Sequence, residues 1–340
     1  MTEAELKALH GFLAQHFGNA EAPLCWKISG GQSNPTFFVD YAGRRMVLRK
    51  QPSGPILRGA HAIDREFRVL KALAGTEVPV PEAFVYHAEP DVLDTPFYLM
   101  ERLDGRVFED CALPGMAPEE RRDIYFGMAE ALAKLHSVQP DAIGLDDYGR
   151  PGNYFERQLA RWSRQYNDSP GERIPALDEL VARLPAMMPP DDGRVTIAHG
   201  DFRLGNMLFH PTEPRVIGIL DWELSTLGHP HADLGFCCMP WHTASDEYGG
   251  ILGLGADLGI PSQAEFCAHY NHHVGSDAPL LPFHVAFALF RFSVIFVGIA
   301  DRVRSGNAAA ANAQAVGPLA ACFATRALEV IDGVADHARF

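Results

Sequence analysis

The segment HGDFRLGN, residues 199–206, constrains the fold of this chain more than any other part of it. It lies between two short runs of β character, RVTIA before it and MLFHP after it. A third apolar run, VIGIL, ends at Asp221, fifteen residues beyond Asn206. The pattern therefore predicts a polar loop that holds Asp201 and Asn206 between strands, with a second aspartate at a strand end. Loops on a rigid scaffold are common positions for catalytic side chains.

These three residues suit the transfer of a phosphoryl group to an alcohol. The reaction needs a carboxylate that orients the hydroxyl group and accepts its proton, and Asp201 suits this role. It also needs oxygen ligands that hold Mg²⁺ against the phosphates, and Asn206 and Asp221 suit that role. The Asp-x4-Asn spacing equals that of the protein-kinase catalytic loop, and Asp221 takes the place of the DFG aspartate. One such loop alone is more often a turn or a helix cap, but the loop and Asp221 together predict a kinase-type site.

The remaining pattern predicts an α+β fold with two lobes. Residues 24–50 read as β-hairpins, residues 61–74 as a helix, and two proline-bounded strands follow. Beyond Leu103 most segments have helical periodicity. We therefore expect a small β-rich N-lobe over 1–102, with an N-terminal helix and a hinge, and a larger helical C-lobe over 103–340. The C-lobe would carry the catalytic loop and the acceptor pocket, with a cleft between the lobes.

Composition excludes several classes of protein. The net charge of −14 argues against nucleic-acid binding, which requires a basic surface. The six cysteines form no CxxC pair and read as buried thiols in a reducing compartment. The N-terminus does not resemble a signal peptide, and residues 283–300 contain His284 and Arg291, so a buried helix is expected rather than a membrane span. A cytoplasmic protein is predicted, and the sequence assigns it no oligomeric state.

HGDFRLGN followed by ILDWE resembles the catalytic signature of the aminoglycoside phosphotransferase and choline kinase superfamily, a branch of the protein-kinase-like fold. The stretches SGGQSNPTFFV, MVLRKQP and AHAIDREFRVLKAL are similar to the kinase-like domain that is fused to certain acyl-CoA dehydrogenases, and to its free-standing bacterial relatives. The resemblance implies ATP and Mg²⁺ as cofactors. It also implies direct in-line transfer of the γ-phosphate to a small-molecule hydroxyl acceptor.

The resemblance assigns a phosphate-binding turn near the N-terminus. The turn is expected to lie over the ATP phosphates and comprises Gly30, Gly31, Gln32, Ser33 and Asn34. Glycine allows close approach of the backbone, and Ser33 and Asn34 add hydrogen-bond donors. The turn departs from G-x-G-x-x-G, and an ordinary hairpin turn is the alternative.

The strand MVLRK is expected to supply the cation for the α- and β-phosphates. The family pattern matches Arg49, with Val47 beneath the base, and strand alternation puts both on one face and Lys50 on the other. A shift of one residue in this match would exchange Arg49 for Lys50. Glu66 matches the glutamate that holds the cation, with a surface charge as the alternative.

FYLMERLDG resembles the hinge between the lobes. Backbone groups of Glu101 and Leu103 are expected at the adenine edge, and Met100 is expected to pack nearby or simply in the core. In the C-lobe, His199 is expected to tie the catalytic loop to the strand of Asp221.

Two groups of histidines raise the question of a metal site. His229 and His231 lie near Asp233 in GHPHADLG, which reads as a loop, but a third zinc ligand is not obvious. Asp233 is instead predicted to brace the catalytic loop through backbone N–H groups. Helical spacing puts His269 and His273 on one face, where an exposed pair is the preferred interpretation.

The acceptor pocket is expected to lie within residues 150–305. Aromatic and basic residues are candidates for its lining, although each could belong to the core: Tyr154, Trp162, Trp241 and Arg291. The fused relatives suggest a hydroxyacyl acceptor, free or as its CoA thioester, or a related metabolite. An aminoglycoside is the alternative acceptor, but no acidic cluster reserved for one is identified.

Two other classes of function compete with the kinase. A catalytically silent ATP-binding pseudokinase is disfavoured because Asp201, Asn206 and Asp221 are all present. A zinc-dependent hydrolase would have to use the His and Asp pairs. No G-x-x-x-x-G-K-[ST] motif occurs, so a Walker-type nucleotide hydrolase is unsupported.

Overall fold

The protein divides into two compact units that are not two contiguous halves of the chain. The computed structural model describes residues 1–18, 21–28, 34–53, 62–150, 152–254, 256–305 and 317–334. The first unit comprises Met1–Gly105 and Ile217–Glu223, and the second comprises Arg106–Val216 and Leu224–Phe340. The boundary between the two lobes that is predicted from the sequence, at residues 102 and 103, stays a prediction. The sequence did not predict that Ile217–Glu223 would belong to the first unit.

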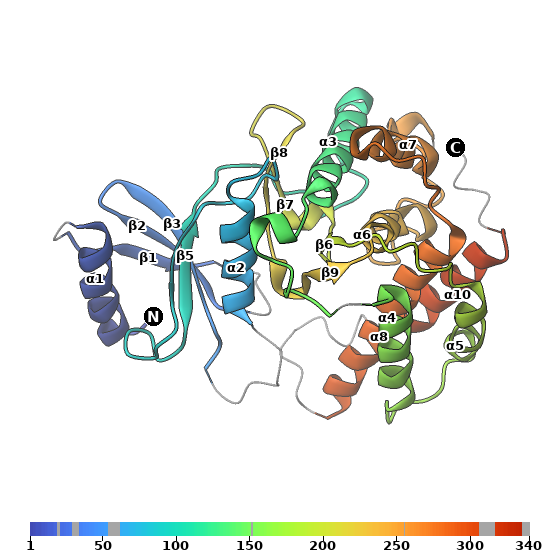
Figure 1. The fold of residues 1–340 in the computed structure, drawn as a ribbon, viewed down its shortest axis with the longest axis horizontal. Coiled ribbons are helices and arrows are strands. Elements are labelled where there is room, and N and C mark those ends of the chain that lie inside the picture. Colours follow the sequence, from blue (N-terminus) through green and yellow to red (C-terminus); the bar gives the residue numbers. More distant parts are fainter. Residues whose placement is uncertain are drawn as a thin grey trace. The chain divides into compact units, whose positions relative to one another are not determined.

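The first unit is built on a five-stranded antiparallel sheet (Figure 1). Its strands are β1 (Leu24–Lys27), β2 (Thr36–Tyr41), β3 (Arg44–Lys50), β4 (Ala83–His87) and β5 (Phe97–Glu101). Their order across the sheet is β1-β2-β3-β5-β4. Ala42 and Gly43 both have positive φ, 52° and 76°, as a two-residue turn that suits the twist of a hairpin requires. The antiparallel strands predicted within residues 24–50 are present in the described part of that range.

Helices cover both faces of this sheet. Helix α1 (Glu3–Phe17) begins with a capping box between Thr2 and Glu5, and it buries Leu9, Phe12 and Leu13 against the sheet core. Helix α2 (Ile63–Leu73) contacts β4 and β5 instead. Side chains that alternate along each strand therefore face different helices, α1 on one face of the sheet and α2 on the other. This alternation decides which side chains of β3 belong to the structural core and which belong to the candidate site.

The second unit consists mostly of helices. They are α3 (Pro118–Ser137), α4 (Tyr154–Asn167), α5 (Pro175–Met187), α6 (Pro230–Cys237), α7 (Gln263–Val274), α8 (Pro282–Arg304) and α10 (Leu319–Ile331). Short strands flank the catalytic segment: β6 (Thr196–Ala198), β7 (Met207–Phe209) and β9 (Thr226–Gly228). Strands β6 and β9 pair antiparallel. At β8 (Val216–Ile219) the chain passes from the second unit to the first.

Helix α8 is long and apolar enough to cross a membrane, the one such helix in the described part of the chain. However, 72% of its most apolar stretch is buried within the protein. It packs against α10, α6, α4 and α5, as Figure 1 shows around its orange ribbon. The helix therefore has the environment of a core helix, as the sequence pattern predicted.

The segment GHPHADLG was predicted to be a loop, and this prediction was wrong. Gly228 ends β9, and α6 begins two residues later. His229 caps the helix by accepting a hydrogen bond from the backbone N–H of His231, and Pro230 occupies the first helical position, where its missing N–H costs nothing. Histidine is an unusual cap, so the helix start was not recognised in the sequence.

Candidate active site

A buried carboxylate braces the loop that follows β6. Asp233, on α6, is 1% exposed, and its two oxygens accept hydrogen bonds from the backbone N–H groups of His199 at 2.6 Å and Gly200 at 2.9 Å. His136 contacts the same carboxylate at 3.4 Å. Burial alone raises the pKa of Asp233, but the hydrogen bond and charge of His136, the charge of His199 and the Gly200 N–H outweigh it, so the pKa lies below its ordinary value. The predicted bracing role of Asp233 is confirmed.

The backbone of the loop is held on its other side as well. Gly200 has φ of 84°, and a Cβ at this position would lie 2.8 Å from the carbonyl oxygen of Leu224. Only glycine fits both conditions. The Gly200 carbonyl oxygen accepts a hydrogen bond of 2.8 Å from Arg291 of α8. Arg291, a sequence candidate for the acceptor pocket, therefore supports the loop instead.

Asp201 and Asn206 lie in direct contact. The Asn206 amide nitrogen donates to the Asp201 backbone oxygen at 2.8 Å and to its carboxylate Oδ2 at 2.7 Å. Arg203 lies 3.4 Å from the same carboxylate oxygen, and the Asp201 backbone N–H donates to His199 Nδ1 at 3.2 Å. The carboxylate is thus oriented by its neighbours yet remains 20% exposed, so a substrate hydroxyl can reach it. Sequence reasoning missed Arg203, although it lies inside the motif.

In the first unit, Arg49 is the centre of a buried ion-pair group. Its Nε lies 3.3 Å from Glu66 of α2, and its Nη2 donates to Asp221 at 3.1 Å. Glu66 is 1% exposed and also accepts hydrogen bonds of 2.9 Å from Tyr98 and from Asn34. Tyr98 lies directly opposite Arg49 on the neighbouring strand β5. The sequence did not predict that Tyr98 belongs to this site. The predicted Arg49–Glu66 ion pair is present; its role in nucleotide binding stays a prediction.

Burial dominates the protonation of Glu66. It raises the pKa of Glu66 to about 7, although Arg49 acts in the opposite direction. The group therefore holds a glutamate whose charge is poised near neutral pH. A change in the charged groups that contact Arg49 would therefore shift the pKa of Glu66.

Lys50, the alternative cation, points to the other face of the sheet. Its Nζ donates to Glu5 of α1 and to the carbonyl oxygen of Leu93, both at 2.8 Å. The pKa of Glu5 is lowered to about 2, chiefly by the hydrogen bond from Lys50. This arrangement supports Arg49 rather than Lys50 as the phosphate-binding cation.

The end of β8 offers oxygen ligands for a metal ion. Asp221 has φ of 64°, an uncommon conformation for a residue other than glycine, and such residues occur often at functional sites. One carboxylate oxygen from each of Glu66, Asp221 and Glu223 lies within 4.8 Å of the others. Hard oxygen donors of this kind fit Mg²⁺. Glu223 was missed, although the quoted motif ILDWE contains it.

Only Asn34 of the predicted phosphate-binding turn lies within the described residues. Gly30, Gly31, Gln32 and Ser33 lie outside the described residues. Asn34 is buried, and its amide nitrogen donates a hydrogen bond of 2.9 Å to Glu66; its contact with a phosphate stays a prediction.

The predicted adenine-binding residues belong to the same sheet. Val47 and Met100 are buried and pair opposite each other on β3 and β5. The Glu101 N–H donates to the carbonyl oxygen of Glu82, so only the carbonyl oxygen of Glu101 could meet an adenine edge. Leu103 lies just beyond β5 and is half-buried. The contacts of these residues with adenine stay predictions.

The histidines near Asp233 do not join it as ligands. Both Asp233 oxygens are engaged by the catalytic loop, and His229 contacts Asp192 at 3.2 Å instead. Burial lowers the pKa of His231 to about 3, which keeps its ring neutral. This group therefore reads as part of the packing around α6.

A cavity of about 460 Å³ begins at the residues that directly follow Asp201. Its wall is mostly apolar and aromatic, with Met128, Phe202, Phe236, Met239, Tyr248, Phe292 and Phe323. Glu109, Asp110 and Arg203 are its charged residues. The sequence candidates Tyr154, Trp162 and Trp241 are not among its lining residues, and Trp241 is a core residue that donates to Pro261.

Comparison with known proteins identifies the class. Residues 26–265 match the phosphotransferase enzyme family, APH. Acyl-CoA dehydrogenase family member 10 of Mus musculus is 40% identical over 320 residues, which cover 92% of this chain and 29% of that protein. The chain spans less than half the length of these dehydrogenase relatives. For acyl-CoA dehydrogenase family member 11 of Gallus gallus, the matched region is 40% of that protein's length. The chain belongs to the phosphotransferase enzyme family.

Solved structures agree with this assignment. A protein from Ralstonia eutropha JMP134, assigned provisionally by name to the aminoglycoside phosphotransferases, has a TM-score of 0.88 and 44% identity, with coverage of 96% of this chain and 98% of that chain. A spectinomycin phosphotransferase in complex with ADP and spectinomycin has a TM-score of 0.62 at 12% identity, with coverage of 96% and 98%, and shows the fold alone. The protein-kinase-like fold, with a small β-rich N-lobe and a larger helical C-lobe, is thus confirmed, and the family match supports a small-molecule kinase.

Proposed function

We propose that the protein transfers the γ-phosphate of ATP to the hydroxyl group of a hydroxyacyl metabolite, either free or as its CoA thioester. Family membership supports the kinase-type reaction. The observation that carries the acceptor class is the apolar cavity beside Asp201, whose aromatic wall suits an acyl chain. The similarity to acyl-CoA dehydrogenase relatives supports the same acceptor class.

In the proposed reaction Asp201 is the base. Its carboxylate orients the acceptor hydroxyl and takes its proton as the new O–P bond forms and the bond from phosphorus to the ADP oxygen breaks. Asn206 fixes the carboxylate through its amide nitrogen, which directs its amide oxygen elsewhere. No phospho-enzyme is formed.

Asn206 and Asp221 are the proposed Mg²⁺ ligands, and the carboxylate of Glu223 is a further candidate. The ion would offset the charge of the phosphates. Arg49 is the proposed clamp on the α- and β-phosphates, supported by Glu66.

An aminoglycoside acceptor is the second candidate, since Glu109 and Asp110 give the cavity two carboxylates. A polycationic antibiotic would have to leave most of the aromatic wall without a complementary contact, so we rank it below the hydroxyacyl acceptor.

The test is ATP consumption with Mg²⁺ across hydroxyacyl-CoAs, free hydroxy acids, amino alcohols, sugars and aminoglycosides. We expect turnover with hydroxyacyl compounds and a loss of about 10²–10⁴-fold in Asp201→Asn, the range that a positioned base contributes. Binding of ATP and Mg²⁺ should persist in that variant.

Three outcomes would contradict parts of the proposal. Unchanged turnover in Asp201→Asn would remove Asp201 as the base. Turnover confined to aminoglycosides would replace the acceptor class. ATP binding without turnover on any acceptor would favour a pseudokinase.

A further inference from the structure

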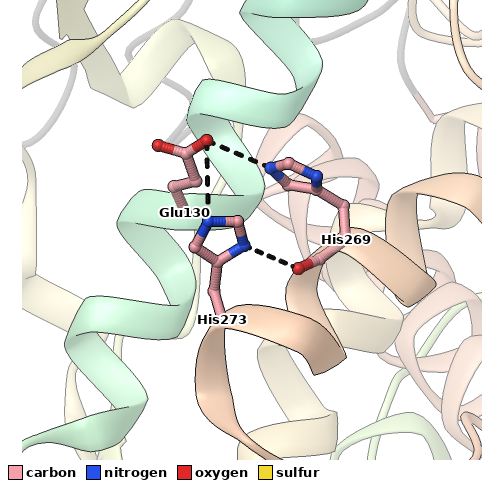
Figure 2. A group of neighbouring side chains, drawn as sticks. All are labelled: Glu130, His269 and His273. Atoms are coloured by element: carbon pink, nitrogen blue, oxygen red, sulfur yellow. Dashed lines mark hydrogen bonds and ion pairs between the residues drawn. The ribbon is translucent and has the colours of Figure 1, made fainter.

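Three side chains gather on α3 and α7 of the second unit (Figure 2). Glu130 comes from α3, and His269 and His273 come from successive turns of α7, where residues four apart share a face. One ligand atom from each lies within 4.8 Å of the others. The two helices pack against each other, so regular secondary structure holds all three side chains.

The distances suit one transition-metal ion. Glu130 Oε1 lies 3.1 Å from His269 Nε2 and 3.9 Å from His273 Nε2. Ligand atoms at about 2.0–2.2 Å from a tetrahedral zinc ion lie about 3.4 Å from one another. The two measured distances lie on either side of this value. Two imidazoles and one carboxylate, with a solvent position open, form a ligand set that zinc accepts.

The hydrogen bond at His273 Nδ1 determines the tautomer of the ring and so the state of Nε2, which faces Glu130. His273 Nδ1 lies 2.9 Å from the backbone carbonyl oxygen of His269, which can only accept, so Nδ1 carries the proton. In the neutral ring, Nε2 then directs a lone pair at a carboxylate oxygen. These two acceptors lie 3.9 Å apart, and a proton on Nε2, a bridging water or a metal ion can satisfy both. A carbonyl that accepts from the other ring nitrogen is the usual support of a metal-binding histidine.

His269 is also held in place. Its ring stacks on Phe126 at 4.2 Å with an interplanar angle of 11°. The side chains of His269, His273 and Glu130 are 25%, 36% and 42% exposed, so an ion from solvent can reach them. The neighbouring His272 is exposed but does not belong to the group.

We propose that Glu130, His269 and His273 bind one divalent ion of the zinc class, which ties α3 to α7. The imidazole nitrogens distinguish this site from the oxygen ligands proposed for Mg²⁺. The proposal does not depend on the phosphotransferase reaction.

The test uses the full chain without a polyhistidine tag, freed of metal with EDTA. Zn²⁺ is titrated by calorimetry, and Co²⁺ is titrated by visible absorption as a reporter of coordination geometry. We expect a site that binds one Zn²⁺ and raises the melting temperature. His269→Ala and His273→Ala should weaken it by more than the roughly 10–100-fold that loss of a ligand's hydrogen-bond partner costs. His272→Ala is the matched control and should bind like the unmodified chain.

Circular dichroism and melting in EDTA show whether each variant is folded, and Glu130→Gln provides a third ligand change if a histidine variant is not. Equal Zn²⁺ affinity in the unmodified chain and in the folded ligand variants would overturn the proposal. The absence of any Zn²⁺-dependent shift in melting would overturn it as well. A melting temperature that responds to pH through His273 but not to Zn²⁺ would assign the position to a proton instead.

Discussion

The Asp201 loop and the Arg49 group are stabilised by different kinds of interaction. In the second unit, the carboxylate of Asp233 accepts hydrogen bonds from the backbone of the loop, so the course of the chain itself is held. In the first unit, side chains hold one another, since Arg49 pairs with Glu66 and with Asp221.

This difference matches what each group has to do in the proposed reaction. A base must keep one position, and the Asp201 carboxylate accepts a hydrogen bond from Asn206 on a loop whose backbone Asp233 braces. A phosphate-binding cation must exchange partners, and the carboxylates around Arg49 carry the same charge sign as the phosphates that would replace one of them. Ion pairs among side chains permit that exchange, whereas the bracing by Asp233 does not.

Removal of the brace should have the largest effect on stability. Asp233→Ala leaves two buried N–H groups without acceptors, and each costs about 1–3 kcal/mol, so we expect a loss of about 2–6 kcal/mol. Asp233→Asn keeps one acceptor oxygen and should lose less. Urea denaturation at pH 7 measures both variants. A loss below about 1 kcal/mol for the alanine variant would mean that the loop has other support.

The Arg49 group should make stability depend on pH. The folded protein keeps the Glu66 proton up to about pH 7, whereas an ordinary glutamate releases it near 4.5. The folded state therefore binds more protons in this window, and stability falls as the pH rises through it. The effect is at most about 3.5 kcal/mol, since each pKa unit corresponds to ~1.4 kcal/mol.

Glu66→Gln should remove this dependence. The difference in free energy of unfolding between the two proteins should change between pH 4.5 and 7 and stay constant above it. A difference that does not vary with pH would show that Glu66 is ionised throughout, as a strong ion pair with Arg49 would require.

The smallest effect is expected at Gly200. Gly200→Ala places a non-glycine residue in a left-handed backbone conformation, which costs about 1–2 kcal/mol. The added methyl group would also lie too close to the Leu224 carbonyl oxygen. Gly275→Ala is the matched control, because Gly275 has φ of 69° but open space around a Cβ. Thermal denaturation should show a greater loss at Gly200. Equal losses would mean that the loop yields to the added methyl group.

The candidate site was predictable to different degrees in the two units. HGDFRLGN contains Asp201 and Asn206 within six residues of each other, so the motif alone brought them together. Arg49, Glu66 and Asp221 lie far apart in the chain, and their grouping in the sequence prediction came from the family resemblance. Asn34, which is predicted to bind phosphate, also donates a hydrogen bond to Glu66, and no local spacing predicted that contact.

The sequence by itself determined the kinase-type loop, the hairpins, most of the helices and the face of β3 on which Arg49 lies, because these depend on local spacing and on the alternation of residues along a strand. Only the tertiary structure decided that Arg291 supports Gly200, that α6 begins at Pro230, and that Glu130 meets two histidines of α7. These contacts join residues of separate elements. Their partners depend on how helices and loops pack, and no local pattern encodes that packing.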